Sequence, residues 1–248
     1  MAALLDGVPG VPFAGDDGQV EIPALDLDGQ NRLEHAQAVT ETDGGVLFSD
    51  RNGIVAFQDK HHRTKNERTV RATYGNGGGS ELPFTMIEPE FDEARLFTAA
   101  AITPSSGTVQ TAENATAVAD HWKRTKELTT LHVSDNEALA MAHAFANNYS
   151  VPRTRIPGIR LTPALVGSSM WATVFGHEIS HRIKTVDRPF GATVNREHFV
   201  EGIRGSFSAE SFDIALGVSL AELDGDFLLI GTGEIGDDGG ATSGIIGW

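Results

Sequence analysis

The chain has 248 residues, no cysteine and a formal net charge of −15. Disulfides and thiolate metal sites are therefore excluded, and the negative charge would repel nucleic acid phosphates and anionic membranes. No run of about 18 apolar residues occurs, and Met1–Leu5 lacks the basic start of a secretory signal, so we predict neither a membrane insertion nor specific nucleic-acid binding. If the protein lines a conduit for DNA, an acidic lining would reduce binding of the DNA to the protein.

The first 29 residues mix Gly, Pro and Asp, and they offer no convincing start to a domain. One strand-like run, Val20–Leu25, lies within them. A helix is predicted over Asn31–Thr42, where the helical spacing puts three residues on one face: Leu33, Ala36 and Thr40.

A β-hairpin is predicted directly after this helix. Two apolar runs, Val46–Phe48 and Ile54–Phe57, flank the polar segment Asp50–Gly53. The Asn52-Gly53 pair in this segment accepts the positive φ angles that a tight reversal demands.

A strand over Thr69–Tyr74 and a glycine-rich loop over Gly75–Ser80 follow. A loop of this composition can bind phosphate only when a helix N-terminus follows it. Here Glu81-Leu82-Pro83 follows, so we reject a phosphate site. A further strand is predicted over Leu96–Ile102.

The middle of the chain carries a turn at Thr103–Gly107 and an alternating run at Thr108–Thr111. The segment His121–Arg124 combines basic and aromatic residues in the manner of a nucleic-acid patch. Its surroundings are strongly acidic, so we interpret Trp122 as an ordinary half-buried tryptophan.

The second substantial helix is predicted over Ser134–Tyr149. Ser134 and Glu137 have the spacing of a capping box, and Val151-Pro152 prevents continuation of the helix. His143 is placed on its polar face. The apolar face comprises Leu139, Ala142, Phe145 and Tyr149.

A strand over Arg153–Leu161 is predicted next, with Ile159 and Leu161 on one side. A short helix over Pro163–Val174 would then bury three side chains: Leu165, Met170 and Trp171.

His177-Glu178-Ile179-Ser180-His181 fits the zinc-peptidase pattern H-E-x-x-H. In that chemistry, two histidines on one helical face bind Zn²⁺, and the glutamate activates the metal-bound water. A third ligand could come from any of three later residues: Glu197, His198 or Glu201.

The flanking residues favour a different structure over this segment. Gly176 directly precedes the first histidine, and Arg182–Val186 alternates like a strand, which would separate the two imidazoles. Lys184 stands where the extended metzincin motif has a glycine. We therefore predict a turn followed by a strand, with no catalytic, cofactor-binding or metal-binding residues, and keep the zinc peptidase as the alternative.

Near the C-terminus, Phe199–Ile203 and Ser206–Gly217 predict two strands joined as a hairpin around Arg204–Ser211. Residues 223–248 are rich in Gly and predict a flexible tail. Its apolar end, Gly244–Trp248, either docks on a neighbouring subunit or frays.

Several of these segments together resemble minor tail proteins of siphovirus-type bacteriophages and prophages. The likeness covers the helix with the hairpin of Gly44–Arg63, the turn Glu178–Arg182, the corner Arg188–Gly191, the strand Phe199–Ile203 and the terminal Gly244–Trp248. The helix-plus-hairpin unit is more distantly similar to the baseplate hub of contractile tails and type VI secretion spikes. Family members are usually longer at the N-terminal end, so the chain is expected to match their C-terminal half.

The resemblance implies a structural virion protein of the tail tip or baseplate hub, assembled in the host cytoplasm and active in host attachment. Its partners would be other tail proteins: the tail tube, the distal tail protein and the tape measure. It implies no catalytic residues and no cofactor. By analogy with hub proteins, we expect a homo-oligomeric ring, most simply a trimer. A cell-wall or receptor-binding module remains a further hypothesis.

The expected fold is α+β, with mainly antiparallel sheets and the two long helices packed on sheet faces. We expect a helix-and-hairpin domain over residues 1–103. A second α+β domain, with the capped helix and terminal hairpin, would cover residues 104–222. The Gly-rich tail would cover residues 223–248.

Overall fold

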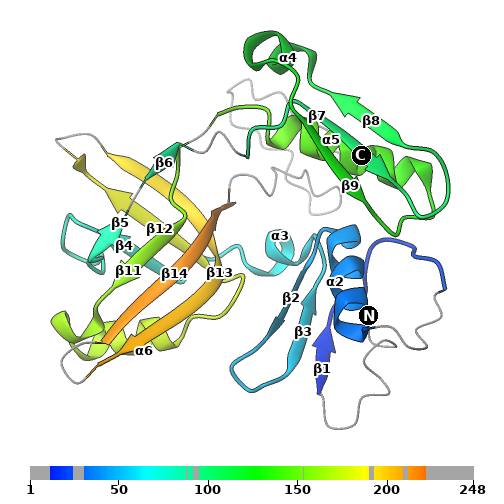
Figure 1. Cartoon of the computed structure of the whole chain (residues 1–248). Coiled ribbons are helices and arrows are strands. Elements are labelled where there is room, and N and C mark those ends of the chain that lie inside the picture. The colour runs from blue at the N-terminus through cyan, green and yellow to red at the C-terminus, as the bar shows by residue number, and fades with distance from the viewer. Residues whose placement is uncertain are drawn as a thin grey trace, which may run out of the picture.

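A computed structural model describes residues 12–24, 31–87, 89–91, 95–152, 154–189, 193–208 and 212–221. This part of the chain is a mixed α+β structure whose strands form four sheets, and most strand pairs are antiparallel, as predicted. Figure 1 shows three groups: a six-stranded sheet, a small sheet beside helix α2, and a three-stranded sheet beside helix α5. Within the described residues, no helix has both the length and the apolar character needed to cross a membrane.

The predicted hairpin forms part of the first sheet, and the predicted helix precedes it in the chain. Helix α2 (Arg32–Asp43) begins at Asn31, whose side chain accepts a hydrogen bond from the Leu33 amide. The sheet has the order β1-β3-β2, and its strands are β1 (Phe13–Gly15), β2 (Val46–Ser49) and β3 (Val55–Gln58).

The hairpin turn uses a positive φ angle at Gly53 (78°) alone, while Asn52 keeps a negative one. Two other expectations for this region are wrong. Residues 20–24 form no strand, and the three residues of β1 instead pair in parallel with β3. Leu33 is 57% exposed, because the buried face of α2 is formed by Ala36, Val39 and Thr40.

The six-stranded sheet holds the larger core. Its order is β4-β12-β13-β14-β11-β5, which brings together strands far apart in the sequence. Tyr74, Leu161, Ile183 and Leu216 are fully buried on it, together with Met170 from helix α6 (Ser168–Phe175). The strands are β4 (Ala72–Gly75), β5 (Met86–Ile87), β11 (Gly158–Leu161), β12 (Arg182–Asp187), β13 (Val194–Phe207) and β14 (Phe212–Leu220).

Two predicted elements of this region are interrupted. The strand expected over 153–161 divides into β10 (Thr154–Arg155) and β11, because Pro157 between them has no amide to donate. The helix expected over 163–174 divides into a 3₁₀ turn, η2 (Pro163–Leu165), and α6, where Gly167 takes a φ of 105°.

The terminal hairpin is present but longer than predicted. β13 continues through Arg204 to Phe207, so the reversal starts after that residue and not at Arg204. Ile159 and Leu161 point into the core, as predicted.

The third sheet has the order β8-β7-β9 and is covered by α5 (Asp135–Asn148). Its core is built mainly from alanines, including Ala138, Ala142 and Ala146 of the helix. The strands are β7 (Ala99–Thr103), β8 (Gln110–Glu113) and β9 (Thr125–Thr129), of which β9 was not predicted. The remaining elements are β6 (Glu90–Phe91), α3 (His62–Asn66) and α4 (Ala115–His121).

Two predictions for this region are wrong in detail. Ser134 occupies the N-cap position of α5, but its side chain makes no capping hydrogen bond, so the capping box does not form. Trp122 is 81% exposed and not half-buried, because it lies in the sharp turn between α4 and β9 with a φ of 62°. His143 is exposed on the polar face, as predicted.

The division into residues 1–103, 104–222 and 223–248 stays a prediction. β7 ends at Thr103 and pairs with β9, which lies beyond that boundary. The predicted tail and its apolar end lie outside the described residues.

Candidate functional site

The H-E-x-x-H segment forms a turn between a helix and a strand. Helix α6 ends at Phe175, with Gly176 as its C-cap, and β12 begins at Arg182. Between them, Ser180 has a φ of 69°, a left-handed conformation that interrupts any helix. The predicted turn and strand are confirmed, and the continuous helix that a zinc peptidase needs is not formed here.

The two imidazoles consequently face different partners. Their ring centroids lie 6.2 Å apart, with the ring planes at 75° to each other. Nε2 of His177 is 2.6 Å from the hydroxyl of Tyr74, and Nδ1 of His181 accepts the amide of Glu178 at 3.1 Å. One nitrogen of each ring is therefore used for internal hydrogen bonding.

Burial holds the Tyr74–His177 pair in its neutral form. It lowers the pKa of His177 to about 4 and raises the pKa of the Tyr74 phenol. The pKa of His181 is also lowered, mainly by burial. At neutral pH the pair is an uncharged hydrogen bond inside the protein.

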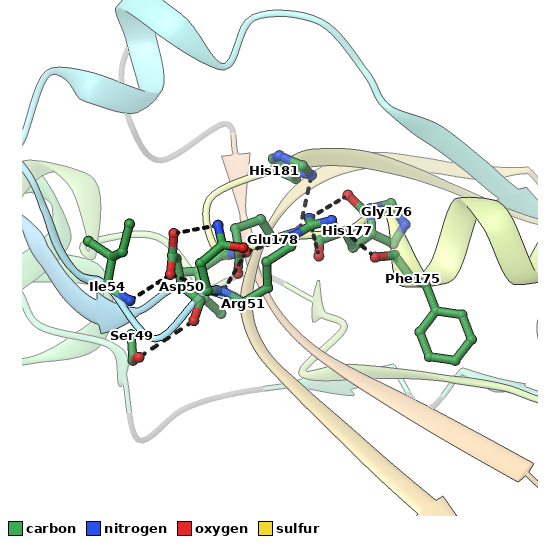
Figure 2. Close-up of polar contacts among 11 residues, drawn as sticks. Ser49, Asp50, Arg51, Ile54, Phe175, Gly176, His177, Glu178 and His181 are labelled. Atoms are coloured by element: carbon green, nitrogen blue, oxygen red, sulfur yellow. Dashed lines mark hydrogen bonds and ion pairs between the residues drawn. The ribbon is translucent and has the colours of Figure 1, made fainter. Parts of the chain in front are cut away.

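Glu178, which would be the general base of a peptidase, is bound by an arginine from the hairpin (Figure 2). Nε of Arg51 lies 3.2 Å from the Glu178 carboxylate, and the Arg51 amide donates to the same oxygen at 3.2 Å. The carboxylate thus serves as an anchor for the tip of the β2–β3 hairpin.

The same guanidinium caps the C-terminal end of α6. Its Nη2 donates to the carbonyls of Gly176 (3.0 Å) and His177 (3.2 Å), and its Nη1 donates to that of Phe175 (3.4 Å). A cation at this end of a helix interacts favourably with the helix dipole and with carbonyls that lack helical partners.

The hairpin tip that carries Arg51 is itself fixed by Asp50. The Asp50 carboxylate accepts the amides of Asn52 and Ile54, each at 2.8 Å. Its hydrogen bond with the Ile54 amide is the main reason why the pKa of Asp50 is lowered. The loop is thereby preorganised to present the guanidinium to α6.

A second ion pair joins the same two parts of the molecule. Arg63 binds the carboxylate of Glu201 through both terminal nitrogens, each at 2.7 Å, and its Nε donates to the buried hydroxyl of Ser180. We call the pairs Arg51–Glu178 and Arg63–Glu201, together with Ser180, the junction. It connects the first sheet and the segment after it to the six-stranded sheet.

The three candidate third ligands are also engaged elsewhere. Glu201 belongs to the junction, Glu197 pairs with Arg182 at 2.6 Å, and Nε2 of His198 lies 2.9 Å from the Thr185 hydroxyl. Across the described residues, no group of three or more histidines and carboxylates is placed to hold a metal ion.

Sequence reasoning identified the H-E-x-x-H segment but missed the residues that hydrogen-bond to its side chains. Arg51 lies 127 positions from Glu178, and Tyr74 lies 103 positions from His177. No local pattern links such distant positions, because the contacts arise from the packing of sheets. The signal available in the sequence was Gly176, which marked the end of a helix.

Two solved structures of tail proteins, one of them from a prophage, share this fold. A tail protein from Neisseria meningitidis MC58 matches 90% of this chain with a TM-score of 0.60 and 12% identity. The 43 kDa tail protein of prophage MuSo2 from Shewanella oneidensis matches 89% of it with a TM-score of 0.58 and 13% identity. No protein-family model matches the sequence, and no curated protein does.

The chain therefore shares its fold with phage tail proteins, which confirms the structural side of the resemblance. The aligned part covers 65% of the Neisseria protein and 63% of the Shewanella protein, so the chain spans slightly less than two thirds of each.

Proposed function

We propose that the protein is a structural component of a phage or prophage tail. The observation that carries this proposal is the fold, which is shared over about nine tenths of the chain with the tail proteins of Neisseria and Shewanella. Because one fold can host several functions, the geometry of the candidate site is the second line of support.

The site supports a structural role in preference to a catalytic one. A peptidase would need Glu178 to activate a metal-bound water, yet this carboxylate binds Arg51 and fixes the hairpin to α6. The histidines contribute to packing and hydrogen bonding through Tyr74 and the Glu178 amide. The protein acts without catalytic residues, metal or cofactor.

Within the tail, the chain belongs to the tail tip or baseplate hub, where it joins the tail tube to the apparatus that contacts the host. It assembles with copies of itself into a closed ring, most simply a trimer, because a ring satisfies every head-to-tail interface. Its other partners are the tail tube, distal tail and tape-measure proteins, and it functions in the virion tail after assembly in the host cytoplasm.

Co-expression with the tail proteins encoded beside it tests this proposal. The chain should co-purify with a tail-tube or distal-tail protein, and electron microscopy of the complex should show rings. Failure to associate with any of these proteins, while the chain remains folded, would contradict the proposed role. A pull-down on intact host cells would test the receptor-binding hypothesis in the same preparation.

The peptidase alternative has a separate test. Elemental analysis of the purified chain and a casein-cleavage assay should find no bound zinc and no turnover. One zinc per chain that is lost together with activity in a His177→Ala variant would favour the peptidase.

A further inference from the structure

Two Asn-Gly pairs occur in the sequence, and both lie in exposed turns. Asn52-Gly53 forms the tip of the β2–β3 hairpin, and Asn76-Gly77 directly follows the last residue of β4. All four residues are exposed. Asparagine is a thermolabile residue, and a following glycine has no Cβ to obstruct attack of its main-chain nitrogen on the asparagine side chain. Both pairs are therefore candidates for a spontaneous covalent change.

The contacts that restrain Asn52-Gly53 all come from the same turn. Nδ2 of Asn52 donates to the Asp50 carboxylate at 3.3 Å, and the Gly53 amide donates to the Asp50 carbonyl at 3.0 Å. The amide of Asn52 donates to that carboxylate as well. In the described part of the chain, no atom lies within 4 Å of the position that a Cβ on Gly53 would take. The tip can therefore change its conformation without displacing any other segment.

Asn76-Gly77 is held by residues from distant parts of the chain. Nδ2 of Asn76 donates to the Asp187 carboxylate at 2.8 Å, and its Oδ1 accepts the Arg188 amide at 3.1 Å. The Gly77 amide donates to the Glu81 carboxylate at 2.9 Å, and the Arg188 guanidinium lies against Gly77. Both polar atoms of this asparagine side chain are thus engaged with the end of β12 and the residue after it. The side chain cannot turn toward the Gly77 nitrogen without breaking these contacts.

We propose that Asn52 is a site of spontaneous deamidation and that its contacts protect Asn76 from the same reaction. The main-chain nitrogen of Gly53 attacks Cγ of Asn52, and the new C–N bond closes a cyclic imide. Nδ2 leaves as ammonia and takes the proton that the Gly53 nitrogen gives up. Water then opens the imide. Addition of water at Cγ yields aspartate, and addition at the main-chain carbonyl carbon yields isoaspartate, in which the chain runs through Cγ.

Either product disturbs the junction. A carboxylate at position 52 puts a second negative charge where an N–H group now donates to Asp50. Isoaspartate also lengthens the main chain of the turn by one methylene group. Arg51, the preceding residue, binds Glu178 and the carbonyls at the end of α6. Deamidation therefore displaces the guanidinium and irreversibly loosens the contact between the hairpin and α6.

Peptide mapping by mass spectrometry, during storage of the full chain at mildly alkaline pH, tests the proposal. In the folded chain, Asn52 should deamidate about tenfold faster than Asn76, because reaction at Asn76 must also break a further hydrogen bond and displace Arg188. In guanidinium chloride, which removes these contacts, the two pairs should react at similar rates. Equal rates in the folded chain would overturn the proposal. So would an unmodified Asn52 after a time in which both pairs of the unfolded chain have reacted.

Two variants test whether the contacts determine the difference. Asp187→Ala removes the acceptor of the Asn76 amide and should accelerate deamidation there, while the rate at Asn52 stays unchanged. Asn52→Gln keeps a side-chain amide at the tip but requires a larger ring, so the tip should remain unmodified. An Asp187→Ala chain that is folded and still reacts slowly at Asn76 would contradict protection by these contacts.

Hydrogen exchange tests the consequence for the junction. Amides of residues 50–54 and 176–181 should exchange faster in the stored chain than in the fresh one, whereas stored Asn52→Gln should match its fresh sample. Unchanged exchange in a chain fully converted at Asn52 would contradict the loosening of the junction. These measurements use the isolated chain, so their outcome and that of co-purification with tail proteins are independent.

Discussion

The six-stranded sheet beside α6 and the sheet covered by α5 are built from side chains of very different size. The six-stranded sheet buries Tyr74, Leu161, Met170 and Leu216, whereas α5 meets the three-stranded sheet mainly through alanines such as Ala142. Small side chains allow a helix to approach a sheet closely, but each buries little apolar area. The comparison teaches that the first core gains stability from the volume it buries, and the second depends on the close fit of its surfaces.

The largest expected effect is in the six-stranded core. Leu216 is fully buried at the centre of this sheet, so Leu216→Ala should lower the free energy of unfolding by about 2–5 kcal/mol through lost burial and a residual cavity. Urea denaturation measures this change. Leu33→Ala removes the same atoms from an exposed position and should cost less than about 1 kcal/mol. Equal losses in the two variants would contradict the assignment of the core.

The alanine core should be destabilised by larger side chains, whereas the six-stranded core is destabilised by smaller ones. Ala142→Leu inserts a large side chain between α5 and its sheet and should cost about 1–3 kcal/mol. The control is Ala140→Leu, on the exposed face of the same helix, which should be nearly neutral. If both variants were equally stable, the close approach of α5 to the sheet would be wrong.

Acid should weaken most the region of the six-stranded sheet, which holds the two histidines with the most strongly lowered pKa values. Burial lowers the pKa of His177 and of His198 to about 4 from an ordinary value of 6.5. Their folded pKa values lie below the unfolded ones, so the unfolded chain binds more protons between pH 6.5 and 4, and stability falls as pH falls through that range. Each should cost on the order of 2 kcal/mol between pH 7 and 5.

Urea denaturation at pH 7, 6 and 5 measures this loss. His177→Gln should make the decrease shallower, while a variant of the exposed His143 should leave it unchanged. Hydrogen exchange at pH 5 should show earlier loss of protection around His177 and His198 than in α5. A flat profile from pH 7 to 5 would contradict the neutral buried histidines.

The sequence predicted elements whose causes are local. The hairpin followed from Gly53, the second long helix from its spacing and from Pro152, and the turn at the H-E-x-x-H segment from Gly176. These signals act within a few residues, so no tertiary information was needed.

The failures had causes outside the local sequence. β1 has three residues and exists because β3 offers it an edge. Residues 20–24 resemble a strand but pair with none of the described strands. Trp122 is exposed because the turn before β9 directs it outward, against its usual preference for burial. At the candidate site, Arg51 reaches α6 through the packing of two sheets, and composition gave no sign of that contact.

The smallest expected effect is at the junction. Arg51→Ala removes an ion pair and three carbonyl contacts, but the Arg51 side chain is half exposed, so the loss should be about 1 kcal/mol. Arg51→Lys should lower the free energy of unfolding nearly as much, because the single ammonium of lysine cannot replace the several N–H donors of the guanidinium. Arg68→Ala, whose guanidinium donates to the Thr64 carbonyl one helical turn away, is the control. A loss shared equally by all three variants would remove the special role of Arg51.

Native mass spectrometry of the intact chain over a range of concentrations tests the central claim most directly, because it reports subunit number and bound metal together. The account predicts closed, metal-free oligomers that become dominant as concentration rises. A chain that stays monomeric at every concentration and carries one zinc ion, lost on His177→Ala, would contradict it.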